Sequence, residues 1–164
     1  MIFLSMGLSV ASTVSAEVQE YEIKAAFIYN FISFTEWPEK TGANINICTL
    51  GESPLNIAFD ALKKKSAKGV TIMIHRLRIE DSLKDCQVIF LGELDRMSFI
   101  KVMSSLKSMP ILTVTDSAGL VEEGVMIELG IEERRIVFKI NVESAKKSRL
   151  MISSKLLRLA KVVY

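Results

Sequence analysis

The sequence predicts a single α/β domain with a mainly parallel sheet, an antiparallel edge hairpin and helices on both faces. Three observations lead to this fold class. Short β-branched strands alternate with helical segments, which is typical of parallel sheets with crossover helices. Two strand patterns near the C-terminus follow each other closely enough to pair as a hairpin. The 164 residues are 49% hydrophobic and 24% charged, which suits one full core and excludes a disordered chain.

The N-terminal stretch, residues 1–16, predicts a secretory signal peptide, and residues 17–164 then form the mature domain. The stretch is uncharged and mostly apolar, and it ends in Val14-Ser15-Ala16, a small-residue pattern of the kind that signal peptidase cuts. It carries no early Lys or Arg, so a start codon further upstream or a first core helix is the alternative. We expect an exported, soluble periplasmic protein that begins at Glu17.

A first helix is expected from Glu20 to Trp37, before Pro38. Its apolar residues surround nearly the whole circumference, so it must be buried on two sides. It either packs between the sheet and the C-terminal helix or presents its outer side to a partner or to a second copy in a homodimer. The candidate partner contacts on it are aromatic: Phe27, Tyr29, Phe31 and Trp37.

The middle of the chain predicts four strands and two helices. The strands are expected at residues 45–50, 70–77, 88–91 and 111–114, and the helices from Pro54 to about Lys65 and from Leu94 to Leu106. Ser53 is the expected N-cap of the first of these helices, with Pro54 in its first turn. Residues 88–91 are apolar throughout, which predicts a strand covered on both faces.

The C-terminal third predicts a hairpin and then one long helix. Residues 125–129 and 135–140 read as strands joined by a longer loop over residues 130–134. Asn141 is the expected cap of a helix that continues to Tyr164, because no Gly or Pro interrupts this segment. Its basic side supplies further candidate partner contacts: Lys155, Arg158 and Lys161.

Charge is unevenly distributed along the chain. The net charge is only +2, which gives no reason to expect a nucleic-acid partner, but the segment 144–164 holds six basic residues and no acidic one. The basic character therefore belongs to the C-terminal segment.

Enzymatic signatures are absent from the sequence. There is no nucleophile elbow, dinucleotide fingerprint or phosphate loop, and the single His75 cannot form a metal site or a triad alone. Gly51 and Gly92 stand where a phosphorelay receiver needs carboxylates. We expect no catalytic residue, no metal and no cofactor.

A ligand crevice remains the alternative to a partner-binding role. Loops at the carboxyl ends of parallel strands form crevices, and Glu52, Ser53, Asp116 and Ser117 follow predicted strands together with Glu93. These residue types are equally common in turns.

The two cysteines predict a disulfide. Cys48 lies within the first strand and Cys86 just before the third, so they are neighbours if those strands pair. An even count in an oxidising compartment favours a bond over two buried thiols.

Taken together, the chain resembles the YfiR family, small periplasmic proteins that repress a membrane-bound diguanylate cyclase. The matching segments are Lys24–Phe31, Glu36–Pro38, Ile47-Cys48 with Leu50-Gly51, Cys86 with Ile89-Phe90, Leu112–Val114, Met126-Ile127, Phe138–Asn141, and Leu150 with Ser154–Ala160. The resemblance implies an α/β domain, export, no catalysis, and binding to the periplasmic sensor region of the cyclase, which keeps cyclic di-GMP low. The alternative function is a periplasmic small-molecule binder or a cryptic enzyme that uses the crevice.

Overall fold

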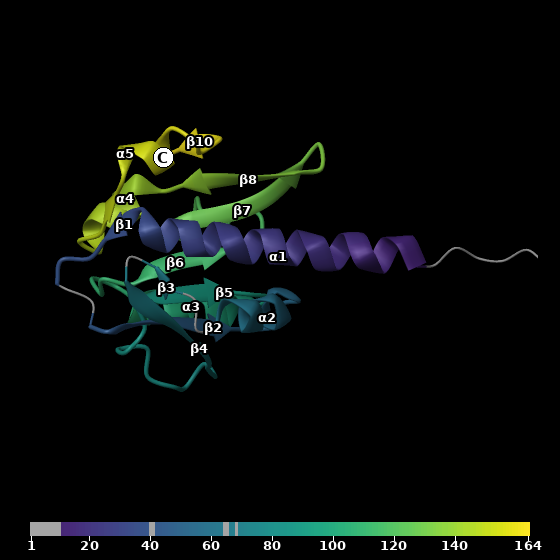
Figure 1. Ribbon diagram of the computed structural model, residues 1–164. Coiled ribbons are helices and arrows are strands. Elements are labelled where there is room, and N and C mark those ends of the chain that lie inside the picture. The colour runs from purple at the N-terminus through teal and green to yellow at the C-terminus, as the bar shows by residue number, and fades with distance from the viewer. Residues whose placement is uncertain (1–10, 40–41, 64–65, 68) are drawn as a thin grey trace, which may run out of the picture.

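The computed structural model describes residues 11–39, 42–63, 66–67 and 69–164, and it is built on one twisted sheet (Figure 1). In chain order the elements are α1 (Ala11–Ser33), β1 (Thr35–Glu36), β2 (Asn44–Leu50), α2 (Leu55–Ala58), the 3₁₀ helix η1 (Phe59–Leu62), β3 (Ser66–Ala67), β4 (Val70–Arg76), β5 (Val88–Leu91), α3 (Arg96–Ser105), β6 (Leu112–Thr115), β7 (Ile127–Glu132), β8 (Arg135–Ile140), α4 (Val142–Lys147), β9 (Met151–Ile152), α5 (Ser154–Leu157) and β10 (Val162–Val163).

The main sheet has eight strands in the order β10-β8-β7-β6-β5-β2-β4-β3. The strands from β4 across β2, β5 and β6 to β7 pair in parallel, and β8 is antiparallel to β7. This confirms the mainly parallel α/β fold. The hairpin is not outermost, however, because β10 pairs in parallel with the outer side of β8.

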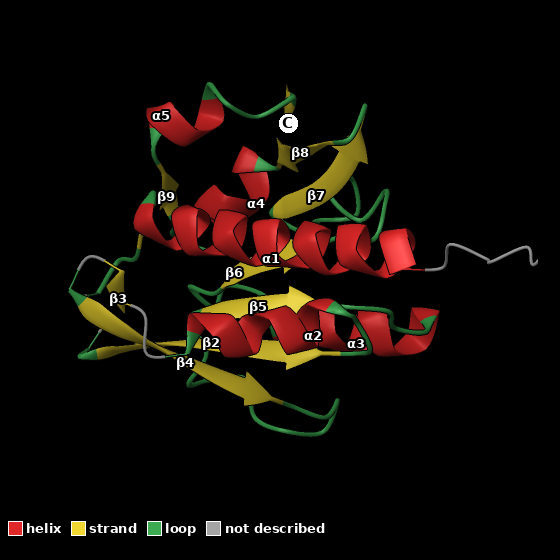
Figure 2. Cartoon of the chain, turned by 45° about the vertical axis from the view of Figure 1, so that its right-hand side comes forward, coloured by secondary structure: helices red, strands yellow, loops and turns green. Residues whose placement is uncertain are grey.

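Helices cover both faces of the sheet, as predicted (Figure 2). On one face, α1 and α2 pack on the inward side chains of β2, β5 and β6 and bury the aromatic rings of Phe31, Phe59 and Phe90. On the other face, α3 contributes Phe99 and Val102 to a second apolar cluster. All residues of β5 and β6 are buried, which explains why β5 is apolar throughout. The two buried threonines of β6, Thr113 and Thr115, form hydrogen bonds through their hydroxyls.

The first helix differs from the prediction at both ends. It begins at Ala11 and ends at Ser33, four residues before Trp37. It ends early because Thr35 and Glu36 pair as β1 with Ile152 and Met151 of β9. Residues 1–10 of the expected signal peptide lie outside the described residues, whereas residues 11–16 form the start of α1.

The helix expected from Pro54 to Lys65 is shorter than predicted, and α2 passes directly into η1, which ends at Leu62. Lys64 and Lys65 lie outside the described residues. The N-cap of α2 is Pro54 and not Ser53 as predicted, although the Ser53 Oγ accepts the Leu55 N–H at 3.1 Å. The four middle strands and α3, capped by Asp95, lie where they were expected within two residues at each end.

The hairpin loop is tighter than predicted. β7 and β8 pair as far as Glu132 and Arg135, so only Glu133 and Arg134 form the turn. Both have positive φ, 47° and 63°, as a two-residue type I′ turn requires. Neither residue is the Asn or Gly that usually marks this turn, so no sequence signal pointed to it.

The prediction of one long C-terminal helix was wrong. α4 ends at Lys147, and the chain then forms β9, the short α5 and β10. Arg149 adopts φ 59°, and the Leu150 N–H bonds back to the Ala145 carbonyl at 2.9 Å, which closes α4 with a left-handed cap. This turn buries Leu150 in the core, and Leu156 of α5 is buried as well.

Arg149→Gly is expected to raise the free energy of unfolding by about 1 kcal/mol, because glycine adopts the left-handed conformation without the Cβ clash. The side chain of Arg149 is exposed, so its loss removes no buried contact. Urea unfolding of the variant should show a higher midpoint at unchanged slope. Lys147→Gly, two residues earlier at the last position of α4, is the matched control and should lower stability.

Candidate functional site

The carboxyl ends of β2 and β5 form the switch point of the sheet, where doubly wound folds bind ligands. Here the backbone closes that point. Glu52 and Glu93 form an antiparallel bridge, and the Glu93 N–H donates to the Glu52 carbonyl at 2.8 Å. A Cβ on Gly51 would lie 2.4 Å from the Glu93 oxygen, and one on Gly92 would lie 2.5 Å from the Glu52 oxygen. Main-chain atoms therefore fill the position that a ligand takes in related folds.

Gly51→Ala is expected to destabilise the domain by about 1–2 kcal/mol, because Gly51 has φ 82° and a Cβ is strained in this left-handed conformation. The clash with the Glu93 carbonyl adds to this by forcing the two strand ends apart. Thermal unfolding should show a lower midpoint. Gly69→Ala is the matched control, since Gly69 also has positive φ but has no atom within 4 Å of an added Cβ. Equal losses at the two positions would contradict the role of the bridge.

The four predicted ligand residues do not form one site. The Ser53 hydroxyl is bonded to the start of α2, and the Asp116 carboxylate accepts a hydrogen bond from Lys24 on α1. Ser117 instead lines a hollow of about 410 Å³ on the α3 side, together with Glu93, Arg96 and Phe99. Glu52 is exposed and contributes its backbone to the bridge.

Lys24 forms a buried ion-pair cluster that was not predicted from the sequence. It is buried, yet its ammonium lies 2.8 Å from Glu20 and 3.2 Å from Asp116, and 5.0 Å from the centre of the Tyr21 ring. Burial by itself lowers the pKa of Lys24, but the hydrogen bonds and charges of Glu20 and Asp116 outweigh it and raise that pKa. The ion pair between Lys24 and Asp116 joins α1 to the loop after β6. The sequence signal for it is that Lys24 is the one basic residue of α1 and lies four residues after Glu20.

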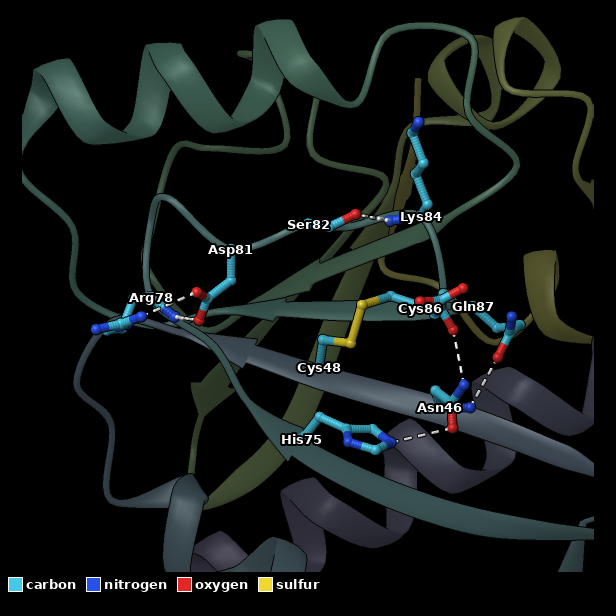
Figure 3. Close-up of a disulfide and its surroundings, with 10 residues drawn as sticks. Asn46, Cys48, His75, Arg78, Asp81, Ser82, Lys84, Cys86 and Gln87 are labelled. Atoms are coloured by element: carbon cyan, nitrogen blue, oxygen red, sulfur yellow. Dashed lines mark hydrogen bonds and ion pairs between the residues drawn. A yellow bond between two sulfur atoms is a disulfide. The ribbon is translucent and has the colours of Figure 1, made fainter.

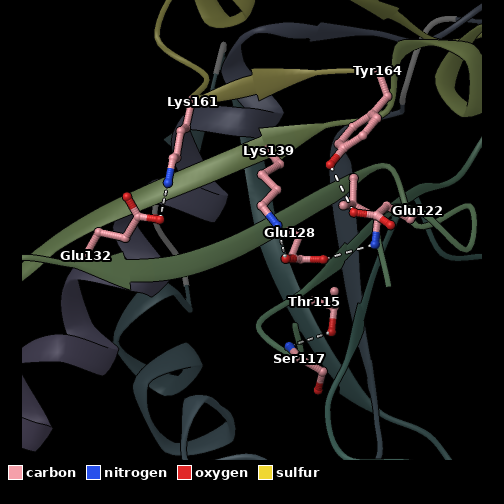
Figure 4. A network of polar contacts seen from close by, with 9 residues as sticks. Thr115, Ser117, Glu122, Glu128, Glu132, Lys139, Lys161 and Tyr164 are labelled. Carbon is pink, nitrogen blue, oxygen red and sulfur yellow. Dashed lines mark hydrogen bonds and ion pairs between the residues drawn. The ribbon is translucent and has the colours of Figure 1, made fainter. Parts of the chain in front are cut away.

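A second buried charge, Glu128 of β7, also organises the loop after β6 (Figure 4). Its carboxylate accepts the Val121 N–H at 3.0 Å and a Lys139 ammonium hydrogen at 3.1 Å, and this hydrogen bond raises the pKa of Lys139. Near it, the Tyr164 hydroxyl donates to Glu122 at 3.1 Å. These contacts tie the loop to the hairpin and to the C-terminal residue.

The predicted disulfide is confirmed (Figure 3). Cys48 of β2 is bonded to Cys86, just before the parallel neighbour β5, with 5.9 Å between the Cα atoms. The two cysteines are 2% and 3% exposed and lie in the cluster under α3. His75 is exposed nearby on β4, and its Nε2 lies 3.1 Å from the Asn46 side-chain oxygen, which is an ordinary strand-surface contact.

The predicted partner contacts fall into two groups. On α1 and just after it, Phe31 is fully buried, with its ring centre 5.1 Å from that of Phe138, so it offers no surface in this structure. Phe27, Tyr29 and Trp37 are half-buried. By contrast, the basic residues Lys155, Arg158 and Lys161 are all exposed, on α5 and just before β10 instead of on one long helix. Lys161 pairs with Glu132 at the end of β7.

Within the described part of the chain, no group of three or more His, Cys, Asp and Glu side chains is placed to hold a metal ion. None of the helices among these residues has the length and hydropathy of a membrane span.

The fold, its closed switch point and its buried ion pairs define a doubly wound α/β domain in which polar side chains mainly hold loops in place. A family model described as YfiR/HmsC-like matches residues 21–161, and the chain belongs to this family, which is regulatory rather than catalytic.

Two solved structures share the fold at low sequence identity. One is an ABC domain from Streptococcus pneumoniae in complex with L-Trp, with 14% identity and a TM-score of 0.56. The other is a conserved domain protein from Vibrio cholerae O1 biovar El Tor, with 13% identity and a TM-score of 0.52. The match covers 88% of this chain and 60% of each of those chains, so this chain spans less than two thirds of their length.

Proposed function

We propose that this protein is a periplasmic repressor that binds the periplasmic sensor region of a membrane-anchored diguanylate cyclase and keeps cyclic di-GMP low. The observation that carries the proposal is the family match, which spans almost the whole described domain. The structure is consistent with a binding role, because backbone atoms close the switch point between β2 and β5 while a basic C-terminal surface is exposed.

The proposal is tested by deleting the gene and measuring cyclic di-GMP. Deletion should raise the cellular concentration, and expression of the full chain in the periplasm should restore the original level. The same chain expressed without residues 1–16 serves as the control for compartment, since it should remain in the cytoplasm and fail to restore the level. An unchanged concentration after deletion in every growth condition would contradict repression.

Small-molecule binding is the second candidate, and the observation that favours it is the hollow of about 410 Å³ at Ser117, Glu93 and Arg96. If a periplasmic metabolite binds there, its presence should raise the thermal midpoint of the parent chain but not of Ser117→Trp, which fills the hollow. A panel of metabolites that leaves the parent midpoint unchanged would remove this candidate.

A further inference from the structure

The register of the hairpin determines which backbone groups of β8 face away from β7. The Asn141 N–H donates to the Met126 carbonyl at 2.8 Å, so this pair is hydrogen-bonded and every second pair along the ladder is as well. Bonded pairs therefore alternate with pairs such as Leu129 with Phe138 and Ile131 with Ile136. The N–H and C=O groups of Ile136, Phe138 and Ile140 consequently point outward from the hairpin.

Only one half of this outer edge is occupied. The Phe138 carbonyl accepts the Lys161 N–H, and the Ile140 carbonyl accepts the Tyr164 N–H, each at 2.8 Å. β10 pairs with Lys139 and Ile140 alone. Among the residues that the structure describes, no backbone partner is found for the outward N–H and C=O of Ile136. The first half of β8 is therefore an open strand edge.

A hollow of about 470 Å³ lies beside the open edge. Its apolar lining comes from Ile136, Val137 and Leu159, and the side chain of Leu159 is 69% exposed. The hollow exists because the chain leaves α5 at Leu157 and reaches β8 only at Lys161. Unpaired backbone groups beside an exposed apolar side chain are the two features that bind an added strand.

The charges around this edge are mainly basic. Glu132 pairs with Lys161, and Glu133 lies 3.7 Å from Arg135. Arg134 in the turn and Arg158 beside Leu159 are exposed and have no ion-pair partner among the described residues. An occupant that carries carboxylates is therefore favoured over one that carries ammonium groups.

We propose that an extended segment of the partner, with β-branched and acidic residues, adds as a strand to the open edge of β8 at Ile136. The proposal rests on the proposed function, because the partner is the periplasmic region of the cyclase. Main-chain hydrogen bonds at Ile136 provide affinity, the hollow at Leu159 takes an apolar side chain, and Arg134 and Arg158 select acidic residues. A second copy of this chain is a poorer occupant, since pairing β8 with itself brings two basic edges together.

Hydrogen exchange of single amides in the full chain tests strand addition directly. The probes are the purified periplasmic regions of the membrane-anchored diguanylate cyclases of the same organism. In the bound state the Ile136 amide should exchange at least about tenfold more slowly than in the free chain. The Val137 and Lys139 amides, which already bond to β7, are the internal control and should change little.

Ile136→Pro tests the same bond by removal. Proline removes the outward N–H but no hydrogen bond to β7, and Ile136→Ala is the matched control because it shortens the side chain but keeps that N–H. The proline variant should bind at least about tenfold more weakly than the alanine variant. If the proline variant does not fold, hydrogen exchange of the Ile136 amide in the parent chain decides whether a strand is added.

The outcomes separate the two proposals. Binding without slower exchange at Ile136 overturns strand addition and leaves repression intact. No binding to any of the cyclase regions overturns the proposed function, and strand addition with it. Slower exchange at Ile136 in the chain alone at high concentration, together with a dimer mass, assigns the edge to a second copy and overturns the acidic partner segment.

Discussion

Replacing both Cys48 and Cys86 with alanine is expected to lower the free energy of unfolding by about 4 kcal/mol. The disulfide closes a loop between residues 38 positions apart, and the chain-entropy estimate for such a loop gives about this value. The bond joins β2 to the start of β5 beneath α3, so its loss also frees the central strands on which both helical layers rest. Urea unfolding should show a much lower midpoint.

The single variant Cys48→Ala is the matched control for this loss. It breaks the same bond, so it should cost nearly as much as the double variant, and the two losses should not add. Clearly additive losses would mean that the cysteines contribute through packing instead of through the cross-link.

The burial of the disulfide also bears on whether it could control the proposed repression. The cysteines are 2% and 3% exposed, and labile disulfides are usually exposed or strained, so we expect a structural bond that periplasmic reductants do not reach. The measurement is cyclic di-GMP in cells that export the double variant at normal levels. Normal repression would exclude a redox switch. A stable exported variant with raised cyclic di-GMP would instead identify one.

Lys24→Met is expected to have the second largest effect, a loss of about 3 kcal/mol. Breaking a buried ion pair from one side leaves the other charge without compensation, at a typical cost of about 3–5 kcal/mol. The lower end applies because the side chains of Asp116 and Glu20 are 16% and 29% exposed and keep some water. Chemical unfolding should show the loss at unchanged slope.

The double variant Lys24→Met with Asp116→Asn provides the control. It removes the uncompensated carboxylate, so it should recover part of the stability lost in the single variant. A double variant that loses the sum of both single losses would mean that the two side chains do not interact.

Alkaline pH should weaken the same contact in the parent chain. The pKa of Lys24 is raised in the folded state, so the ammonium stabilises the fold fully below its unfolded pKa of about 10.5. This contribution is lost as the pH rises through the folded pKa, where Lys24 gives up its proton. The parent should therefore lose stability above about pH 10.5, and Lys24→Met should lose less. Parallel pH curves for the two chains would contradict this assignment.

The sequence by itself determined the sheet. Residues 88–91 are apolar and buried throughout, and an apolar run of that length between turns is typical of a central parallel strand. It also predicted the disulfide, because Cys48 lies in β2, Cys86 lies two residues before β5, and these two strands pair. These features depend on the order of apolar residues and cysteines along the chain, which can be seen in the sequence alone.

Only the tertiary structure decided the C-terminal segment and the site. Residues 142–164 contain no helix breaker, yet Arg149 turns left-handed because that turn brings Leu150 into the core and allows β9 and β10 to pair with distant strands. Likewise, Lys24 contacts Asp116, which lies 92 residues further along the chain. The first half of β8 is open because β10 pairs only with Lys139 and Ile140, at the end of that strand. Such features arise from contacts between segments far apart in the chain. They override local propensity when burial and strand pairing stabilise the fold by more free energy than the unfavourable turn conformation takes away.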